Sequence, residues 1–229
     1  MKRSFLCSSK AGMALMVVCA GLVMSLGACK KSSPVEVPVG EATVRYVNAS
    51  SGSVAQDFYV NGAKKNTTPL AYGSASAYFT IISGPNTFTI NDAGSATANA
   101  TVGGEVSIAD KLTGYYYKNA EGKNIAAFIG DAVATPPAGK ANVRFIHINS
   151  FSTTAFAVKV TGATDPLIPS LAYQTASGYF PVDASTKFDF VAGGVTLSAA
   201  YDGLIVAGKS YTIWVDGSLS TPFTAHIVE

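Results

Sequence analysis

The sequence contains one pattern twice, at a spacing of 99 residues. Residues 42–48 read ATVRYVN and residues 141–147 read ANVRFIH, so that Arg144 follows Arg45 by 99 positions. Further segments pair in the same order: Leu70–Tyr72 with Leu171–Tyr173, Ala75–Phe79 with Ala176–Phe180, and Ala127–Ile129 with Ala225–Ile227. Self-similarity at a period of domain length predicts two copies of one domain in tandem.

Each copy alternates apolar and polar residues in short runs, which is typical of β-strands. Examples are Thr43–Val47, Phe58–Val60 before the turn pair Asn61-Gly62, Tyr78–Ile82 before Gly84-Pro85, and Thr87–Ile90 before Asn91-Asp92. No long stretch has helical spacing. About seven short strands in each copy predict an all-β chain of two tandem immunoglobulin-like β-sandwich domains, with a barrel as the alternative.

The repeat and one proline-rich stretch predict how residues 41–229 divide into domains. Residues 41–134 form the first sandwich domain and residues 140–229 the second. Residues 135–139, Thr-Pro-Pro-Ala-Gly, are expected to be a short stiff linker between them.

The first 28 residues have the order of a secretory signal peptide. Lys2, Arg3 and Lys10 precede an apolar run that closes on Leu-Gly-Ala-Cys at residues 26–29, and the run is shorter than the roughly 20 residues of a membrane-spanning helix. Those four residues resemble the bacterial lipobox, whose cysteine is acylated and becomes the first residue. We expect residues 1–28 to be removed and Cys29 to be lipidated. The alternative is an ordinary signal peptide with an incidental Cys29.

Residues 29–40 are polar and contain prolines, which indicates a lipidated tether. Lys30 follows the cysteine, in place of the aspartate that retains lipoproteins at the inner membrane of enteric bacteria. The predicted location is therefore the cell envelope, with the lipid in the outer membrane and the protein on its periplasmic face or at the cell surface.

Removal of the leader changes both the cysteine count and the charge. Cys7 and Cys19 would leave with it and Cys29 would carry the lipid, so no disulfide is expected. The chain has 16 basic and 14 acidic residues, and loss of Lys2, Arg3 and Lys10 leaves 13 basic ones. A nearly neutral protein with scattered lysines lacks the basic face that binds nucleic acid.

Three segments of the first copy resemble a known family. Val-Arg-Tyr-Val-Asn-Ala-Ser at residues 44–50, Asp57–Gly62 and Leu70–Gly73 are similar to domain-of-unknown-function family 4397 (DUF 4397), found in Bacteroidetes-like lipoproteins. The resemblance implies extracytoplasmic, often tandem domains and carries no activity. The family's first strand ends His-Ala-Ser-Pro; here His147 holds the histidine place in the second copy, Asn48 in the first, and the proline is missing from both.

The residues that could suggest catalysis, nucleotide binding or metal binding are interpreted as parts of the fold. Residues 203–210, Gly-Leu-Ile-Val-Ala-Gly-Lys-Ser, satisfy the P-loop expression, but a strand pattern follows them where a helix is required, so we expect a turn and no bound nucleotide. His147 and His226 stand in no metal-binding spacing, and both are interpreted as core or sheet-end histidines with a hydrogen-bond partner. No cofactor and no metal site are predicted.

Five tyrosines form the candidate binding surface. Tyr115-Tyr116-Tyr117 must alternate between the faces of a strand, so at least one ring is expected to be partly exposed, and Tyr72 and Tyr173 follow Leu-Ala in both copies. Exposed rings could stack on sugars or contact a protein, whereas the alternative is packing in the core.

These features predict a non-catalytic binding or adhesion module of the cell envelope, tethered by its lipid. Envelope proteins and glycans are the expected partners besides the membrane. The alternatives are a structural spacer or a subunit of an envelope complex and, more remotely, an enzyme that acts on polysaccharide or peptide.

Overall fold

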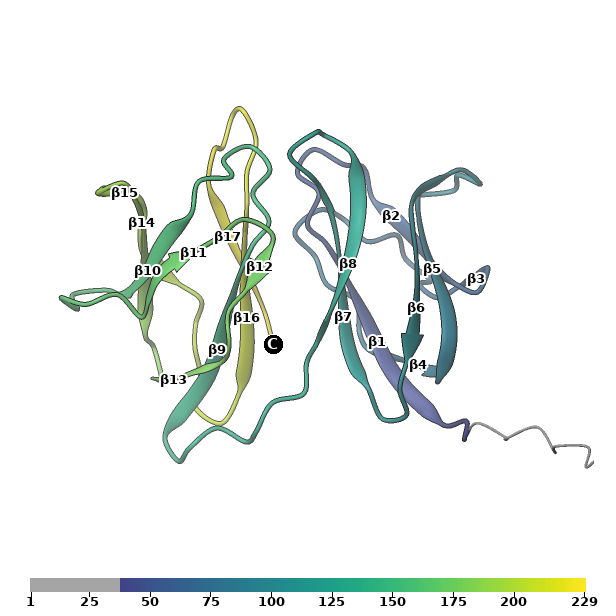
Figure 1. Ribbon diagram of the computed structural model, residues 1–229, viewed down its shortest axis with the longest axis horizontal. Helices are drawn as coiled ribbons and strands as arrows, with labels where there is room; N and C mark the ends of the chain where they lie inside the picture. Colours follow the sequence, from purple (N-terminus) through teal and green to yellow (C-terminus); the bar gives the residue numbers. More distant parts are fainter. Residues whose placement is uncertain (1–37) are drawn as a thin grey trace, which may run out of the picture. The chain divides into compact units, whose positions relative to one another are not determined.

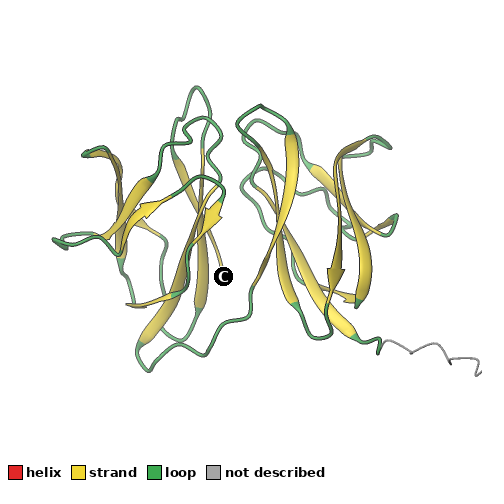
Figure 2. Ribbon diagram, viewed as in Figure 1, coloured by secondary structure: helices red, strands yellow, loops and turns green. Residues whose placement is uncertain are grey.

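The computed structural model describes residues 38–229, which consist of strands joined by loops (Figure 2). The predicted signal peptide, Cys29 and most of the tether lie outside the described residues. No helix capable of crossing a membrane occurs in residues 38–229. The prediction of an all-β fold is confirmed.

The first eight strands form two four-stranded sheets that pack face to face as sandwich 1 (Figure 1). The strands are β1 (Glu41–Asn48), β2 (Gln56–Val60), β3 (Ala63–Lys64), β4 (Phe79–Ile82), β5 (Gly84–Asp92), β6 (Ala98–Val106), β7 (Lys111–Lys118) and β8 (Asn124–Gly130). One sheet has the order β4-β1-β7-β8 and the other the order β3-β2-β5-β6. Their inward side chains, including Val44, Phe58 and Phe88, form the core of sandwich 1.

The remaining strands repeat this arrangement as sandwich 2. They are β9 (Lys140–His147), β10 (Phe156–Val160), β11 (Ile168–Leu171), β12 (Thr175–Ala176), β13 (Phe180–Asp183), β14 (Lys187–Ala192), β15 (Val195–Asp202), β16 (Ser210–Asp216) and β17 (Thr224–Val228). One sheet has the order β12-β9-β16-β17, with β13 also on β9, and the other the order β11-β10-β14-β15. The prediction of β-sandwiches is confirmed.

The repeat holds in three dimensions, with one correction to its last segment. β1 and β7 are parallel, as are β9 and β16, with Arg45 opposite Thr113 and Arg144 opposite Thr212. In the last strands Tyr115 lies opposite Ala127 and Trp214 opposite His226. Ala127 therefore corresponds to His226, and the pairing of Ala127 with Ala225 was wrong by one residue. Such a slip exchanges the two faces of a strand.

One of the predicted turns is confirmed and another is wrong. Asn61 and Gly62 both have left-handed backbone angles, with φ of 50° and 78°, and they join β2 to β3 as the turn prediction requires. The turn expected at Gly84-Pro85 is wrong, because β5 begins at Gly84. There the chain passes from the β4 sheet to the β5 sheet, and the φ of 107° at Gly84 allows the sharp corner.

A third apolar cluster, here called the seam, joins the two sandwiches. Its buried members are Val47, Ala49, Tyr115 and Tyr117 of sandwich 1 and Ile146, Ile148 and Trp214 of sandwich 2. The seam is thus formed by the sheets that contain β1 and β9, and residues Pro38–Glu229 form one compact unit. The predicted domain boundaries, residues 41–134 and 140–229, stay a prediction.

Two arginines at equivalent positions cross the edge of the seam. The Nε atoms of Arg45 and Arg144 donate to the hydroxyls of Thr113 and Thr212, each at 2.8 Å. Arg45 then donates to the backbone oxygen of Glu229. Arg144 donates to the backbone oxygen of Gly130 at 2.6 Å and pairs with Asp131, and both of these charged side chains are at least 95% buried. A buried charge requires its partner.

Replacement of Arg144 by alanine tests the importance of this pair. Arg144→Ala leaves the buried carboxylate of Asp131 without its cation, so the free energy of unfolding in urea should fall by about 3–5 kcal/mol. Lys140→Ala is the control, because its pair with Asp183, at 2.7 Å, is exposed and should contribute less than about 1 kcal/mol. Equal effects of the two substitutions would contradict the prediction.

Candidate functional site

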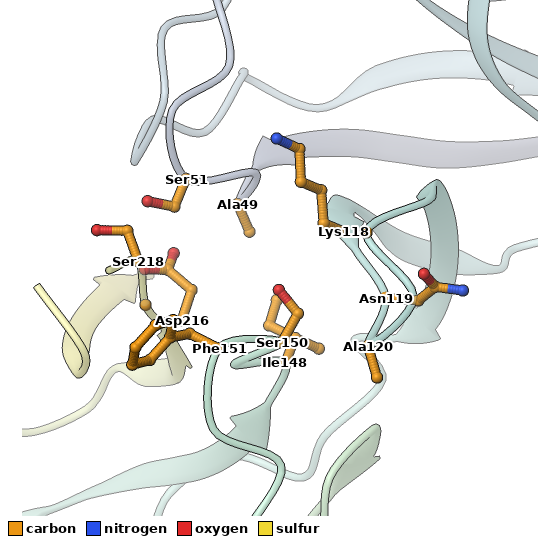
Figure 3. Close-up of a pocket in the computed structure, with 12 residues that line it drawn as sticks. Ala49, Ser51, Lys118, Asn119, Ala120, Ile148, Ser150, Phe151, Asp216 and Ser218 are labelled. Atoms are coloured by element: carbon orange, nitrogen blue, oxygen red, sulfur yellow. The ribbon is translucent and has the colours of Figure 1, made fainter. Parts of the chain in front are cut away.

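Loops of both sandwiches surround a pocket of about 290 Å³, here called the loop-end pocket (Figure 3). Its walls come from the segments that follow β1, β7, β9 and β16. Because β1 is parallel to β7 and β9 to β16, all four strands deliver their carboxyl ends to it. Ser51 and Ser150, which line the pocket, occupy the same position in the two copies.

The lining of the loop-end pocket combines polar groups with one aromatic ring. In Figure 3, Ser51, Ser218 and Asp216 lie on one side and Lys118 and Asn119 on the other. Phe151, from the loop after β9, also lines the pocket and is 46% exposed. The pocket therefore offers a stacking surface together with hydroxyl and ammonium groups, and the buried carboxylate of Asp216 lies in its wall.

Asp216 is held in place by three neighbours. Its carboxylate accepts a hydrogen bond from the Tyr72 hydroxyl at 2.6 Å and one from the Trp214 indole nitrogen at 3.3 Å. The Nε2 atom of His226 lies 3.3 Å from the same carboxylate. Burial, followed by the bond to Asp216, raises the pKa of Tyr72, so its hydroxyl remains a donor well above neutral pH. This network fixes the carboxylate at the pocket wall.

The candidate tyrosines are placed differently from the expectation. Tyr115, Tyr116 and Tyr117 are all buried, so the expected partly exposed ring is wrong. Tyr116 packs in the core of sandwich 1, whereas Tyr115 and Tyr117 pack in the seam, because both faces of β7 are covered. The alternative of core packing holds for these three residues.

Tyr72 and Tyr173 are half-buried, and neither lines the loop-end pocket. Tyr72 acts on the pocket through its hydrogen bond to Asp216. A direct role of these two tyrosines in binding stays a prediction.

The histidines both have partners but lie on different faces. His147 is buried beside the core of sandwich 2, as expected, with its ring 4.6 Å from that of Phe156. His226 lies on the seam face of β17, where its ring stacks on Trp214 at 4.9 Å, whereas its neighbours Ala225 and Ile227 pack on the core. The core interpretation of His226 is corrected to a seam position.

The P-loop-like segment is a turn that enters a strand, as predicted. Strand β16 begins at Ser210, the Gly208 amide donates to the backbone oxygen of Lys140, and Lys209 pairs with Glu229. These groups are used within the fold and do not form a phosphate cradle. Within residues 38–229, no three His, Cys, Asp or Glu side chains gather as metal ligands would.

The sequence patterns did not indicate Phe151 or Asp216 as residues of a site. A signal for Phe151 exists, since it is the one large apolar residue in the polar loop Asn149–Thr154. Asp216 precedes Gly217, as turn-forming residues commonly do, and nothing in the sequence indicates that Tyr72, 144 residues away, donates to it.

The family model described as "Domain of unknown function (DUF4397)" matches residues 42–160, just over half of the chain and extending to the end of β10. The chain belongs to the DUF4397 family. This confirms the resemblance carried by residues 44–50, 57–62 and 70–73. No curated protein matches this DUF4397 chain.

A solved structure similar to the DUF4397 chain is described as CBMbc, of family CBM26, from Eubacterium rectale Amy13K in complex with maltoheptaose. It is 14% identical and the alignment covers 81% of this chain and 96% of that one, with a TM-score of 0.29. At that TM-score the likeness carries no argument about the site.

The environment of His147 makes stability depend on pH. Its Nδ1 accepts from the Asn149 amide at 3.3 Å and its Nε2 donates to the Thr154 carbonyl at 3.1 Å, which is the neutral form of the ring. Burial lowers its pKa in the folded protein. The unfolded chain therefore binds a proton more readily, so His147 destabilises the fold as the pH falls below its unfolded value of about 6.5.

His147→Asn copies Asn48 of sandwich 1 and should flatten this dependence. The measurement is the free energy of unfolding in urea at about pH 7.5 and about pH 5 for both proteins. The free energy of unfolding of His147→Asn should fall less than that of the parent protein when the solution is acidified. An equal loss in the two proteins would show that His147 does not contribute.

Proposed function

We propose that this chain is a lipid-anchored protein of the bacterial cell envelope that binds a hydroxyl-rich glycan, without catalysis, in the loop-end pocket. One observation carries the proposal: the exposed ring of Phe151 shares a pocket with the hydroxyls of Ser51, Ser150 and Ser218 and the carboxylate of Asp216. Sugars present an apolar C–H face and many hydroxyls, and an aromatic ring with convergent polar groups complements both.

The polar groups are arranged for hydroxyl ligands, which both donate and accept. The hydroxyls of Ser51, Ser150 and Ser218 can donate to and accept from a sugar, and the buried carboxylate of Asp216, held by Tyr72 and Trp214, supports the wall from which they project. The ammonium group of Lys118, on the other side, can donate. The volume of about 290 Å³ is at the lower end of ligand pockets, which suits one terminal sugar residue rather than a long chain.

Anchoring belongs to the same proposal and rests on the sequence. A lipidated Cys29, followed by the tether of residues 29–40, would hold the sandwiches on the order of 35 Å or less from the membrane surface. We place the lipid in the outer membrane. Two or three acyl chains bind a membrane firmly, at about 0.8 kcal/mol per buried CH₂.

A spacer or a subunit of an envelope complex is the second candidate function. The buried seam favours it, because the apolar cluster and the Arg144–Asp131 pair would hold the two sandwiches as one rigid unit. Crosslinking in intact cells distinguishes the two functions: a spacer yields protein neighbours alone, whereas a glycan-binding module also retains polysaccharide.

The anchor is tested by substitution of the cysteines. Cys29→Ser should abolish labelling with radioactive palmitate and release the protein from the membrane fraction. Cys7→Ser and Cys19→Ser are matched controls within the leader and should leave labelling intact. Undiminished labelling of Cys29→Ser would refute the lipoprotein assignment.

The pocket is tested by removal of its ring. The lipoprotein in detergent is screened on a glycan array, and the affinity for the best glycan is then measured by calorimetry. Phe151→Ala should weaken binding about tenfold, since a lost ring contact of about 1.4 kcal/mol has that effect. Val195→Ala, on β15 and 64% exposed, should not weaken it. An array without bound glycans, or equal affinities, would reject the glycan proposal.

A further inference from the structure

The repeat makes the two edges of the seam equivalent in backbone structure, but different side chains occupy them. On one edge, the loop after β3 in sandwich 1 faces β16 and β17, and Tyr72 contacts Asp216 and His226. On the other edge, the corresponding loop of sandwich 2 faces β7 and β8. The register of the strands makes Tyr115 equivalent to Trp214, and Ala127 equivalent to His226.

On the His226 edge, the imidazole ring of His226 lies between Trp214 and Gly73. The imidazole ring lies flat on the indole of Trp214, with 4.9 Å between the centroids and 11° between the planes. It also abuts the backbone at Gly73, where a Cβ atom would lie 3.2 Å from the ring. Gly73 has a φ of 77°, which glycine adopts without strain, and its lack of a Cβ atom leaves room for the ring of His226.

The Ala127 edge contains a cavity of about 230 Å³ in the place of that ring, here called the seam cavity. Tyr115, Tyr117, Ala127, Ile129 and Ile146 contribute to its largely apolar wall. The position of Gly73 is taken by Gln174, which has a similar φ of 57° and lines the cavity. A side chain longer than glycine fits here because Ala127 carries no ring.

The seam cavity has a polar end and an opening. The Gln174 side-chain amide donates to the Tyr117 hydroxyl at 3.4 Å. Gln174, Thr175 and Ala176 all line the cavity and are exposed, so a ligand can enter beside β12 without separation of the sandwiches. The cavity shares only Ile148 with the loop-end pocket, which makes it a separate site.

We propose that the seam cavity binds a small molecule with one flat aromatic ring and a hydroxyl substituent. The equivalent space on the other edge holds a flat ring that stacks on an aromatic side chain, and Tyr115 offers such a side chain here. A cavity of about 150 Å³ lined by apolar side chains already binds benzene, so 230 Å³ accommodates a phenol. Gln174 and Tyr117 lie where they can bond the hydroxyl.

The test uses 4-fluorophenol and fluorine NMR on the full lipoprotein in detergent, where uptake by micelles is the same for every variant. The parent protein should bind one equivalent. Ala127→His, which copies the filled edge, should weaken binding about tenfold or more, because the new ring occupies the site. His226→Ala is the matched control that empties the other edge and should add a second equivalent.

A second variant tests the proposal independently in case Ala127→His does not fold. Gln174→Gly copies Gly73 and retains the backbone conformation, so it should weaken 4-fluorophenol about fivefold through the lost hydrogen bond and leave fluorobenzene unchanged. The proposal is overturned if the parent does not bind 4-fluorophenol, or if folded Ala127→His binds it equally well. Glycan binding at the loop-end pocket should be the same in Ala127→His and Gln174→Gly, because neither residue lines that pocket, which separates this proposal from the previous one.

Discussion

The buried guanidinium of Arg144 links the two sandwiches, and the rest of the seam depends on it. It bonds Thr212 of its own sheet and reaches Gly130 and Asp131 of the other sandwich. Such a group is stable out of water only when every partner is in place, so it allows one arrangement of the two sheets rather than many. That arrangement brings the four strand ends together at the loop-end pocket and closes the wall of the seam cavity.

The seam also determines which side chains are available for recognition. A strand in an ordinary two-layer sandwich shows one face to solvent, but β7 has the core of sandwich 1 on one face and sandwich 2 on the other. Three successive tyrosines are thereby buried. The proposed recognition site therefore lies on the loops at the strand ends, where backbone polar groups remain near water and a lone ring such as Phe151 can stay exposed.

The sequence predicted the elements of the fold better than their assembly. Alternation and turn residues located strands such as β1 and the Asn61-Gly62 turn, because these depend on local chemistry. The turn expected at Gly84-Pro85 and the register of Ala127 failed because both depend on which sheet, or which face of it, receives the chain. The seam, the bond between Tyr72 and Asp216 and the seam cavity join residues far apart in the sequence, and no local pattern carries that information.

The repeat explains how one fold can supply two different sites. At the arginine positions the copies kept the same chemistry, since Arg45 and Arg144 make the same bond to a threonine. At the seam edges they differ, with His226 and Gly73 on one side and Ala127 and Gln174 on the other. Equivalent backbones with unequal side chains give one packed edge, whose histidine and tyrosine support the loop-end pocket, and one open edge. The packed edge is thus a direct physical guide to the size and shape of what the open edge can hold.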